Sequence, residues 1–257
     1  MTAAIAALFN HPIKGFTPQK LTTARLAPGE GFPGDRLYAV EDGPCGFDPA
    51  APGFIPKQKF AVLAKTAAVA RARTDYDQRT GMLRASSPGA PDFEADLTHE
   101  DGRTAFAAWL SRLLGDAVQG PLRVIDGVGH RFLDHPLGHV SVINLASLRD
   151  FEARLGRPVD PLRFRANIYV DGWPAWVENG WAGRALRIGN ARAKVFQPIT
   201  RCAAPDVDPS TAARDIEVTR ELHRLYGHLL CGIYVRITQG GTVNNGDEVD
   251  SDPGPLG

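Results

Sequence analysis

The stretch LRIGNARAKVFQPITRC, residues 186–202, decides the fold and ends at Cys202. Apolar and polar side chains alternate along it on both sides of the Gly189-Asn190 pair. Alternation with a period of two, interrupted by a two-residue turn of this kind, is typical of a β-hairpin. The stretch therefore predicts an antiparallel hairpin whose second strand runs directly towards Cys202.

The rest of the chain also contains more strand patterns than helix patterns. Apolar residues alternate with polar ones from Ile233 to Ile237, and the Gly240-Gly241 pair that follows predicts the turn of a second hairpin. The 20 prolines and 27 glycines indicate many turns between short strands. Further strands are expected at residues 36–40, 140–143 and 168–170. We therefore expect a mainly β protein with peripheral helices, of the α+β class, built around a closed or half-closed barrel.

Three amphipathic helices are expected beside these strands. They cover residues 103–114, residues 145–155 and a short segment over 218–225. In the first of them, Phe106, Trp109 and Leu110 recur with the helical spacing of three and four residues. A glycine follows each segment as a C-terminal stop, and Asn144 can cap the start of the second. The apolar stripes favour core packing over a binding face.

The charge balance argues against two classes of partner. The 257 residues contain 29 basic and 29 acidic side chains. A balanced chain without runs of like charge offers no electrostatic argument for nucleic acid or an anionic membrane surface. The apolar N-terminus lacks a basic leader and is interrupted at Pro12 and Lys14, so it is interpreted as a strand and not a signal peptide. No segment is long enough to cross a bilayer, and we expect neither a nucleic-acid partner nor membrane association.

The cysteines indicate a reducing compartment. Cys45, Cys202 and Cys231 are few and odd in number, which fits free thiols in a cytoplasm better than a disulfide framework. No Cys-x-x-Cys pair occurs, so we expect no zinc ribbon and no iron–sulfur cluster in this chain. Cys231 lies in a Leu-Leu-Cys-Gly run ahead of a strand, where a core position is the simplest interpretation.

The pattern of the chain restarts near Gly120. This change predicts two domains, residues 1–120 and residues 121–250. The acidic tail beyond Val249 is rich in Pro and Gly and is expected to fray.

Cys202 differs from the other cysteines in its surroundings. Pro198, Pro205 and Pro209 flank it, forbid a helix and predict a stiff, extended loop. The adjacent guanidinium of Arg201 favours the thiolate, which is the form that attacks electrophiles and binds soft metals. The alternative is a buried structural cysteine in an ordinary loop, and the Arg-Cys pair alone does not exclude it.

A cluster of histidines carries a weaker signal. His130, His135 and His139 would suggest a metal site if they shared one helix face. Pro136 and Gly138 interrupt any such helix, so a polar loop is favoured. No dinucleotide-binding, P-loop or zincin motif occurs in the chain.

Charged residues near turns have two interpretations. Asp206 and Asp208 could bind a divalent ion, but Asp before Pro is common turn chemistry, and the turn is favoured. Lys14, Arg36 and Arg165 lie in turn or strand-end contexts, where each could be an ordinary surface charge. If the three cations converge on one cleft, they would favour a ligand that carries phosphate, because guanidinium groups match phosphate oxygens.

A series of short motifs runs through nearly the whole chain. They are HPIKG at 11–15, GDRLY at 34–38, ASL at 146–148, RFRANI at 163–168, ENGW at 178–181, LRIG at 186–189, TRC at 200–202, DVDPST at 206–211, GIYVRI at 232–237 and GDEV at 246–249. In this order they resemble the MOSC family, the C-terminal module of molybdenum-cofactor sulfurases. The resemblance is closer to the two-part arrangement of the mitochondrial amidoxime-reducing component and its bacterial relatives. It implies an N-terminal β-barrel-like domain followed by a MOSC β-barrel domain.

The resemblance also implies a cofactor and its ligands. A mononuclear molybdenum ion would be held by the dithiolene of a pterin, as the molybdenum cofactor (molybdopterin), and by the thiolate of Cys202. Cys202 would then be both metal ligand and catalytic residue, and a soft thiolate suits a polarisable metal. Thr200 and Arg201 flank this cysteine, where their donors could orient oxo ligands. The positions that would hold the pterin and its phosphate are Lys14, Arg36, Arg165 and Asn167.

The chain departs from the family pattern at four positions. Ala212 stands where Gly usually follows the DPxT turn, and a positive φ there would be strained. Gly15 replaces a small hydroxyl residue, Asn179 replaces an acid near the site, and Ala166 replaces a proline. The ferredoxin-like cysteines and the pyridoxal-phosphate module of some relatives are also missing from the chain. These changes are compatible with the cofactor and leave the substrate open.

These inferences lead to three hypotheses. The first is a molybdenum-dependent oxidoreductase that removes oxygen from small N-hydroxylated or N-oxide-type substrates. Because the chain has no iron–sulfur or flavin motif, its electrons would come from a separate electron-donor protein. The second is a non-enzymatic carrier of sulfur, as a persulfide on Cys202, or of the cofactor itself. The third is a degenerate barrel that has lost its ligand, with which Ala212 and Asn179 are compatible.

Overall fold

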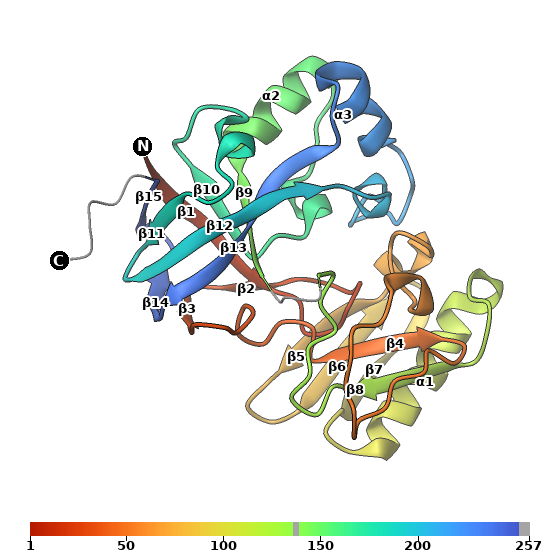
Figure 1. Ribbon diagram of the computed structural model, residues 1–257. Helices are drawn as coiled ribbons and strands as arrows, with labels where there is room; N and C mark the ends of the chain where they lie inside the picture. Colours follow the sequence, from red (N-terminus) through yellow and green to blue (C-terminus); the bar gives the residue numbers. More distant parts are fainter. Residues whose placement is uncertain (136–138, 252–257) are drawn as a thin grey trace.

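Strands dominate the molecule, and the three α-helices of the described chain lie at its periphery, as the sequence predicts (Figure 1). The computed structural model describes residues 1–135 and 139–251. Pro136 and Gly138, which were expected to interrupt a helix, lie outside the described residues. So do residues 252–257 of the tail that was expected to fray. Ser251, at the start of that tail, is buried.

The larger lobe is a closed β-barrel of seven strands. Its strands are β1 (Thr2–Asn10), β9 (Val140–Asn144), β10 (Ile168–Asp171), β11 (Ala185–Ile188), β12 (Ala191–Thr200), β13 (Leu230–Gln239) and β15 (Glu248–Asp250). Their order around the barrel is β10-β9-β13-β12-β11-β15-β1, and β1 pairs with β10 to close the ring. Alternate side chains point inward, as in β1, where Ala3 and Ile5 join the barrel core and a register shift after Ile5 makes Leu8 the next core residue. Closure leaves the ring without a free edge.

The first predicted hairpin is confirmed. Strands β11 and β12 pair antiparallel, with Leu186 opposite Ala193. Gly189 has a φ of 51°, which supplies the left-handed conformation that a two-residue hairpin turn requires. Strand β12 then continues to Thr200 and brings Cys202 to the end of the barrel wall.

The second predicted hairpin is wrong in its pairing. Strand β14 (Gly241–Asn244) follows β13 but pairs with β3 (Thr23–Leu26). Neither Gly240 nor Gly241 has the positive φ that a tight hairpin turn needs. A Cβ on Gly240 would lie 2.9 Å from the carbonyl oxygen of Leu26, so the chain passes close to β3 at this point.

The smaller lobe has a separate apolar core beneath one helix. It contains α1 (Glu100–Leu114) and the strands β4 (Tyr38–Asp42), β5 (Arg73–Asp77), β6 (Met82–Ser87), β7 (Ala90–Asp96) and β8 (Leu122–Asp126). Strand β4 pairs with β8, and β5, β6 and β7 form a meander. The predicted stripe of Phe106, Trp109 and Leu110 on α1 is buried. This helix begins at Glu100, earlier than the predicted Arg103, and ends before Gly115.

The other two helices lie together beside the barrel (Figure 1). They are α2 (Leu145–Leu155), with the predicted bounds, and α3 (Val218–Tyr226). Asn144 caps α2, because its Oδ1 accepts a hydrogen bond from the backbone N–H of Ala146 at 3.1 Å. Gly156 and Gly227 end the two helices with left-handed backbones. No helix in the described part of the chain is long and apolar enough to span a bilayer.

The first strand belongs to the barrel even though the rest of the barrel comes from the C-terminal half. Strand β1 lies between β15 and β10, and β2 (Gln19–Leu21) pairs with the C-terminal end of β1, beyond its pairing with β15. The chain then forms the smaller lobe and returns to the barrel at β9. The domain boundary near Gly120 stays a prediction about the sequence, and residues 2–10 lie with the barrel in space.

Candidate functional site

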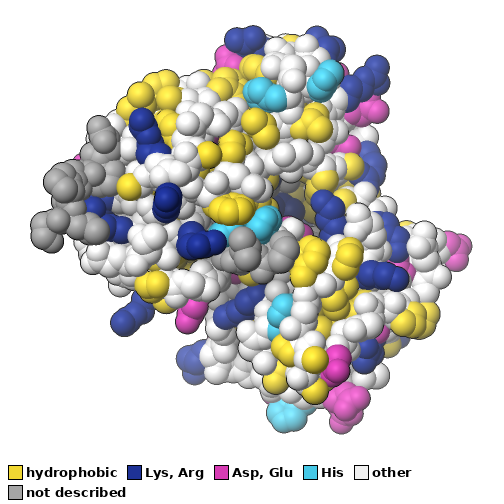
Figure 2. Space-filling view, in the orientation of Figure 1, with side chains coloured by type: hydrophobic (Ala, Val, Ile, Leu, Met, Phe, Trp, Pro, Cys, Tyr) yellow, Lys and Arg dark blue, Asp and Glu magenta, His cyan; other side chains and the backbone are white. Residues whose placement is uncertain are grey.

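A cavity of about 270 Å³ opens between the two lobes. Figure 2 shows the hollow, with basic and histidine side chains gathered around it. All the site residues expected from the sequence line its wall: Lys14, Arg36, Arg165, Asn167, Thr200, Arg201 and Cys202. The structure thus brings together cations that lie far apart in the sequence. Their roles as ligands of a cofactor stay predictions.

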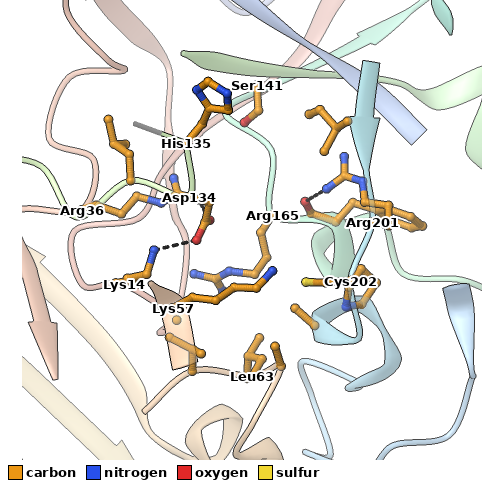
Figure 3. Close-up of a pocket in the computed structure, with 18 of the residues that line it drawn as sticks. Lys14, Arg36, Lys57, Leu63, Asp134, His135, Ser141, Arg165, Arg201 and Cys202 are labelled. Carbon is orange, nitrogen blue, oxygen red and sulfur yellow. Dashed lines mark hydrogen bonds and ion pairs between the residues drawn. The ribbon is translucent and has the colours of Figure 1, made fainter. Parts of the chain in front are cut away.

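Cys202 lies just beyond the end of β12, where the barrel wall meets the cavity. Its side chain is half-buried, and its sulfur points into the cavity (Figure 3). Cys231, in contrast, is fully buried in the core beside α2 and α3, as expected. The loop after Cys202 is less extended than predicted, because Pro205 lies in a 3₁₀ turn at Ala204–Asp206. The structural-cysteine interpretation therefore fits Cys231 and not Cys202.

The guanidinium of Arg201 is occupied by backbone carbonyls. Its Nε and Nη2 donate to the carbonyl oxygen of Cys231 at 2.8 and 2.6 Å. Its Nη1 donates to the carbonyl oxygen of Phe164 at 2.9 Å, and the same group lies over the Phe164 ring. Arg201 thus fastens the chain next to Cys202 to neighbouring segments through their backbones.

Two other cations, Lys14 and Arg36, meet a carboxylate inside the cavity (Figure 3). The ammonium of Lys14, a residue only 2% exposed, donates to Asp134 Oδ1 at 2.6 Å and to the carbonyl oxygen of Phe132 at 2.9 Å. Arg36 forms an ion pair with Asp35 and lies 3.8 Å from Asp134 Oδ2. Burial would raise the pKa of Asp134, but the charges of Lys14 and Arg36 outweigh burial and hold that pKa well below its usual range. Asp134 is therefore ionised at neutral pH.

Arg165 presents an unsatisfied donor at the cavity. It follows a 3₁₀ turn at Pro161–Phe164 and has a left-handed backbone, with φ 53°. Its buried Nη2 has no hydrogen-bond partner in the described part of the chain. Burial and the positive charge of Arg36 lower the pKa of Arg165 to about 10. A bound anion would satisfy this guanidinium.

Asn167 has little hydrogen-bonding capacity left for a ligand. Its Oδ1 accepts hydrogen bonds from the backbone N–H of Ser141 at 3.1 Å and from the Ser141 hydroxyl at 2.8 Å. Its Nδ2 donates to the carbonyl oxygen of Phe9 at 3.2 Å. The side chain therefore ties β9 to β1, and one N–H at most remains available.

Sequence reasoning gave no site role to four charged residues of the cavity wall, Asp35, Lys57, Asp134 and Arg163, and two of these, Lys57 and Asp134, lie outside every motif. Lys57 begins a 3₁₀ turn at Lys57–Lys59, at the end of a Pro-rich loop, and no local pattern distinguishes it from Lys59. Asp134 follows an apolar pair of residues in an irregular segment and carries no motif of its own. Only their convergence in space reveals them.

The three candidate histidines separate in the structure. His130 packs against two phenylalanine rings, whereas the rings of His135 and His139 lie 5.0 Å apart at the cavity. Burial, with the nearby charges of His135 and Arg236, lowers the pKa of His139 to about 4, so this ring is neutral at pH 7. Within the described residues, no group of three His, Cys, Asp or Glu side chains is placed to hold a metal ion.

Asp206 and Asp208 serve turn and capping contacts, as the favoured interpretation predicts. Asp206 Oδ1 accepts a hydrogen bond from the backbone N–H of Val218, at the start of α3, at 2.8 Å. Asp208 Oδ1 accepts hydrogen bonds from the backbone N–H groups of Ser210 and Thr211, both at 2.8 Å. These bonds fix the loop that follows β12.

Both halves of the chain match known domain families. Residues 2–120 match the MOSC N-terminal beta barrel domain, and residues 130–250 match the MOSC domain. The chain belongs to the MOSC family. It is 32% identical to mitochondrial amidoxime-reducing component 1 of Mus musculus over 120 residues, which make up 42% of this chain and 35% of that protein.

Other relatives of this MOSC chain give a similar picture. Mitochondrial amidoxime reducing component 2 of Bos taurus is 32% identical over 124 residues, which cover 43% of this chain and 36% of the relative. The matched segments thus span little more than a third of these relatives. A solved structure, the YuaD protein from Bacillus subtilis, aligns over 97% of this chain and 94% of its own length, with 15% identity and a TM-score of 0.45.

Two departures from the MOSC pattern concern residues with positive φ. Gly15 has a φ of 90°, and a Cβ at this position would lie 3.0 Å from Cα of Val62. A hydroxyl residue would therefore be strained and would collide with the backbone of the smaller lobe. Ala212 has a φ of 62°, so the turn after DPxT keeps a left-handed conformation without a glycine.

Replacing Ala212 with glycine is expected to stabilise the protein. A residue with a side chain is destabilised by about 1–2 kcal/mol in the left-handed region, and glycine avoids this cost. Glycine gives back about 0.5–1 kcal/mol of the difference, because it has more conformational freedom to lose when the chain folds. Ala212→Gly should raise the free energy of unfolding by about 0.5–1 kcal/mol in urea titrations. Ala213→Gly, at a neighbouring residue without positive φ, is the control and should lower it.

The ENGW motif of this MOSC domain lies away from the cavity, so the expected loss of an acid at Asn179 does not change the cavity wall. Glu178 is fully buried. It accepts hydrogen bonds from Asn144 Nδ2 at 3.0 Å and from Ser147 Oγ at 2.7 Å. Burial raises the pKa of Glu178 and outweighs the opposing effect of these hydrogen bonds. The motif therefore acts in packing α2 against the barrel.

Glu178 is expected to make stability depend on pH. Its folded pKa exceeds the ordinary 4.5, so the folded state holds the proton more tightly and stability falls as pH rises from 4.5 through the folded pKa. Glu178→Gln removes this ionisation. The difference in free energy of unfolding, variant minus wild type, should therefore increase with pH between about 4 and 8 in urea titrations. A flat profile for Glu178→Gln would contradict the raised pKa.

Proposed function

We propose that this protein binds the molybdenum cofactor and reduces N-hydroxylated or N-oxide-type compounds, with Cys202 as the molybdenum ligand. One observation carries the proposal: the thiol of Cys202 is half-buried and faces a cavity that several cations line. The names of the relatives, amidoxime-reducing components, supply the substrate class. Amidoximes carry the N-hydroxyl group that such a reaction would attack.

The cavity fits the cofactor in its donor set. The thiolate of Cys202 is a soft ligand for molybdenum. The orphaned buried donor of Arg165 fits an anionic group such as the phosphate of a pterin. Lys14, Arg36, Arg165 and Asn167 would surround the pterin and its phosphate, and Thr200 and Arg201 would support the metal ligand from the end of β12.

The protein's own part in the reaction is binding, orientation and protection from water. The cofactor, when bound, supplies two-electron redox chemistry. Removing oxygen from an N-hydroxyl compound consumes two electrons and two protons and releases water. The electrons would come from a separate electron-donor protein. Arg201 would keep Cys202 in place through its bonds to backbone carbonyls. The three free thiols fit the cytoplasm, or another reducing compartment, as the location.

The proposal is tested on the full chain purified from a host that makes the cofactor. Elemental analysis should find molybdenum, a fluorescence assay should find the pterin, and an amidoxime should be reduced with an artificial electron donor. Molybdenum and pterin at background would refute the proposal. Bound cofactor without turnover, or a labile sulfur adduct on Cys202 in intact mass spectra, would support a carrier in place of an enzyme.

A further inference from the structure

The basic side chains that line the cavity differ in what already neutralises them. They are Lys14, Arg36, Lys57, Arg163, Arg165 and Arg201. An anionic ligand gains most from cations whose charges and donors are not already used by the protein. The contacts of each cation therefore indicate where an anion would bind.

Lys14 and Arg36 are neutralised by the chain itself. The carboxylate of Asp134 accepts a hydrogen bond from Lys14 and lies 3.8 Å from Arg36, which also pairs with Asp35. Lys14, Arg36 and Asp35 are buried, so the Arg36–Asp35 pair is only weakly screened by water, whereas the Asp134 side chain is 42% exposed. A second anion that approached them would meet two ionised carboxylates.

Arg163 and Arg201 are also engaged. Arg163 Nη2 lies 2.8 Å from carboxylate oxygens of both Asp208 and Asp215. All three guanidinium nitrogens of Arg201 donate to backbone carbonyls. Arg163 Nε has no partner within the described residues, but two carboxylates already neutralise the charge of this guanidinium.

Arg165 and Lys57 are left. Arg165 Nη2 is buried without a partner, and the ammonium of Lys57 has no hydrogen bond or ion pair within the described residues, although its charge helps to lower the pKa of Asp134. Figure 3 shows both side chains reaching into the cavity, between Lys14 and Cys202. Each comes from a different lobe, so the pair exists only because the lobes meet here.

We propose that Arg165 and Lys57 form the anion-binding pair of the cavity and take a phosphate monoester dianion, while Asp134 keeps Lys14 and Arg36 neutralised. The inference rests on the proposed function, because it assigns the phosphate-binding part of the same site. It moves the main phosphate contact from Lys14 and Arg36 to a lysine of the smaller lobe. A guanidinium fork and an ammonium together match the charge and the oxygen geometry of such a dianion.

Inorganic phosphate is the probe, titrated by calorimetry into the full chain from a host that cannot make the cofactor. Lys57→Met is expected to weaken phosphate binding about tenfold or more, because it removes a charge-assisted hydrogen bond. Lys59→Met is the matched control, since Lys59 lies in the same 3₁₀ turn but is exposed and outside the cavity wall. The phosphate affinity of Lys59→Met should stay within about twofold of wild type, a much smaller change than the roughly tenfold loss expected when a charged contact is removed. Asp134→Asn should bind phosphate more tightly than wild type.

Equal phosphate affinities of Lys57→Met and Lys59→Met would overturn the inference, as would a wild-type protein that does not bind phosphate at millimolar concentration. Thermal unfolding of both variants verifies that they fold. Failure of the proposed function is recognised separately. Phosphate binding that depends on Lys57, in a protein that takes up no molybdenum from a competent host, would support the anion site and refute the cofactor. Molybdenum uptake, together with phosphate binding that is unchanged in Lys57→Met, would support the cofactor and refute the anion site.

Discussion

Under the proposed function, Cys202→Ala is expected to remove molybdenum from the protein and abolish the proposed reductase activity. Mutation of a residue that only supports a metal ligand lowers metal affinity or activity roughly 10–100-fold. Loss of the ligand itself should lower them at least as much. The half-buried sulfur faces the cavity from the end of β12, so its removal leaves no thiolate in the cavity wall. We therefore expect the molybdenum content per chain to fall at least about tenfold in elemental analysis.

The control for this prediction is Cys45→Ala. Cys45 is also a free, half-buried thiol, but it packs in the smaller lobe and does not line the cavity. Its replacement should leave molybdenum content and turnover near the wild-type values. Equal metal content in the two variants would exclude Cys202 as the ligand, whatever the activity of the protein.

The second large effect is expected from Arg163→Met. Arg163 is buried, and its guanidinium contacts the carboxylates of Asp208 and Asp215 at 2.8 Å. It also donates to the carbonyl oxygens of Pro205 and Asp206 at 3.3 Å. Removing one partner from a fully buried pair costs about 3–5 kcal/mol, but both carboxylates are partly exposed, so we expect about 2–3 kcal/mol less stability in urea titrations.

Arg157→Met is the matched control for this loss. Arg157 binds the same Asp215, through its side chain and its carbonyl, but lies half-exposed at the surface. An exposed pair of this kind contributes about 0.2–1 kcal/mol. If the two variants lose equally little stability, burial of Arg163 does not hold the loop after Cys202 in place.

Much of the fold follows from local signals in the sequence. The bounds of α2 were predictable because a capping Asn144 and a left-handed Gly156 lie directly at its ends. The β11–β12 hairpin was predictable because its turn lies between its strands. The positions of the cavity residues followed from motifs that resemble a family, and the structure brings Lys14, Arg165 and Cys202 to one cavity.

The remaining features depend on contacts between distant segments, which leave no local signal. The pairing of β14 with β3 joins the two ends of the chain, whereas the Gly240-Gly241 pair locally predicts a return to β13. The ion pair of Lys14 with Asp134 likewise joins separate segments. Neither Lys14 nor Asp134 lies in a local sequence pattern that predicts the other as its partner. Lys57 was missed for the same reason.

The position of β1 has a consequence for synthesis of the protein on the ribosome. This apolar strand is made long before its barrel partners β10 and β15. Until then its backbone lacks those partners, and such long-range pairing is slow and exposes the nascent chain to aggregation. The larger lobe can close only after β15 has been made, and a gene fragment that encodes residues 121–250 alone lacks β1 and therefore one of the seven barrel strands.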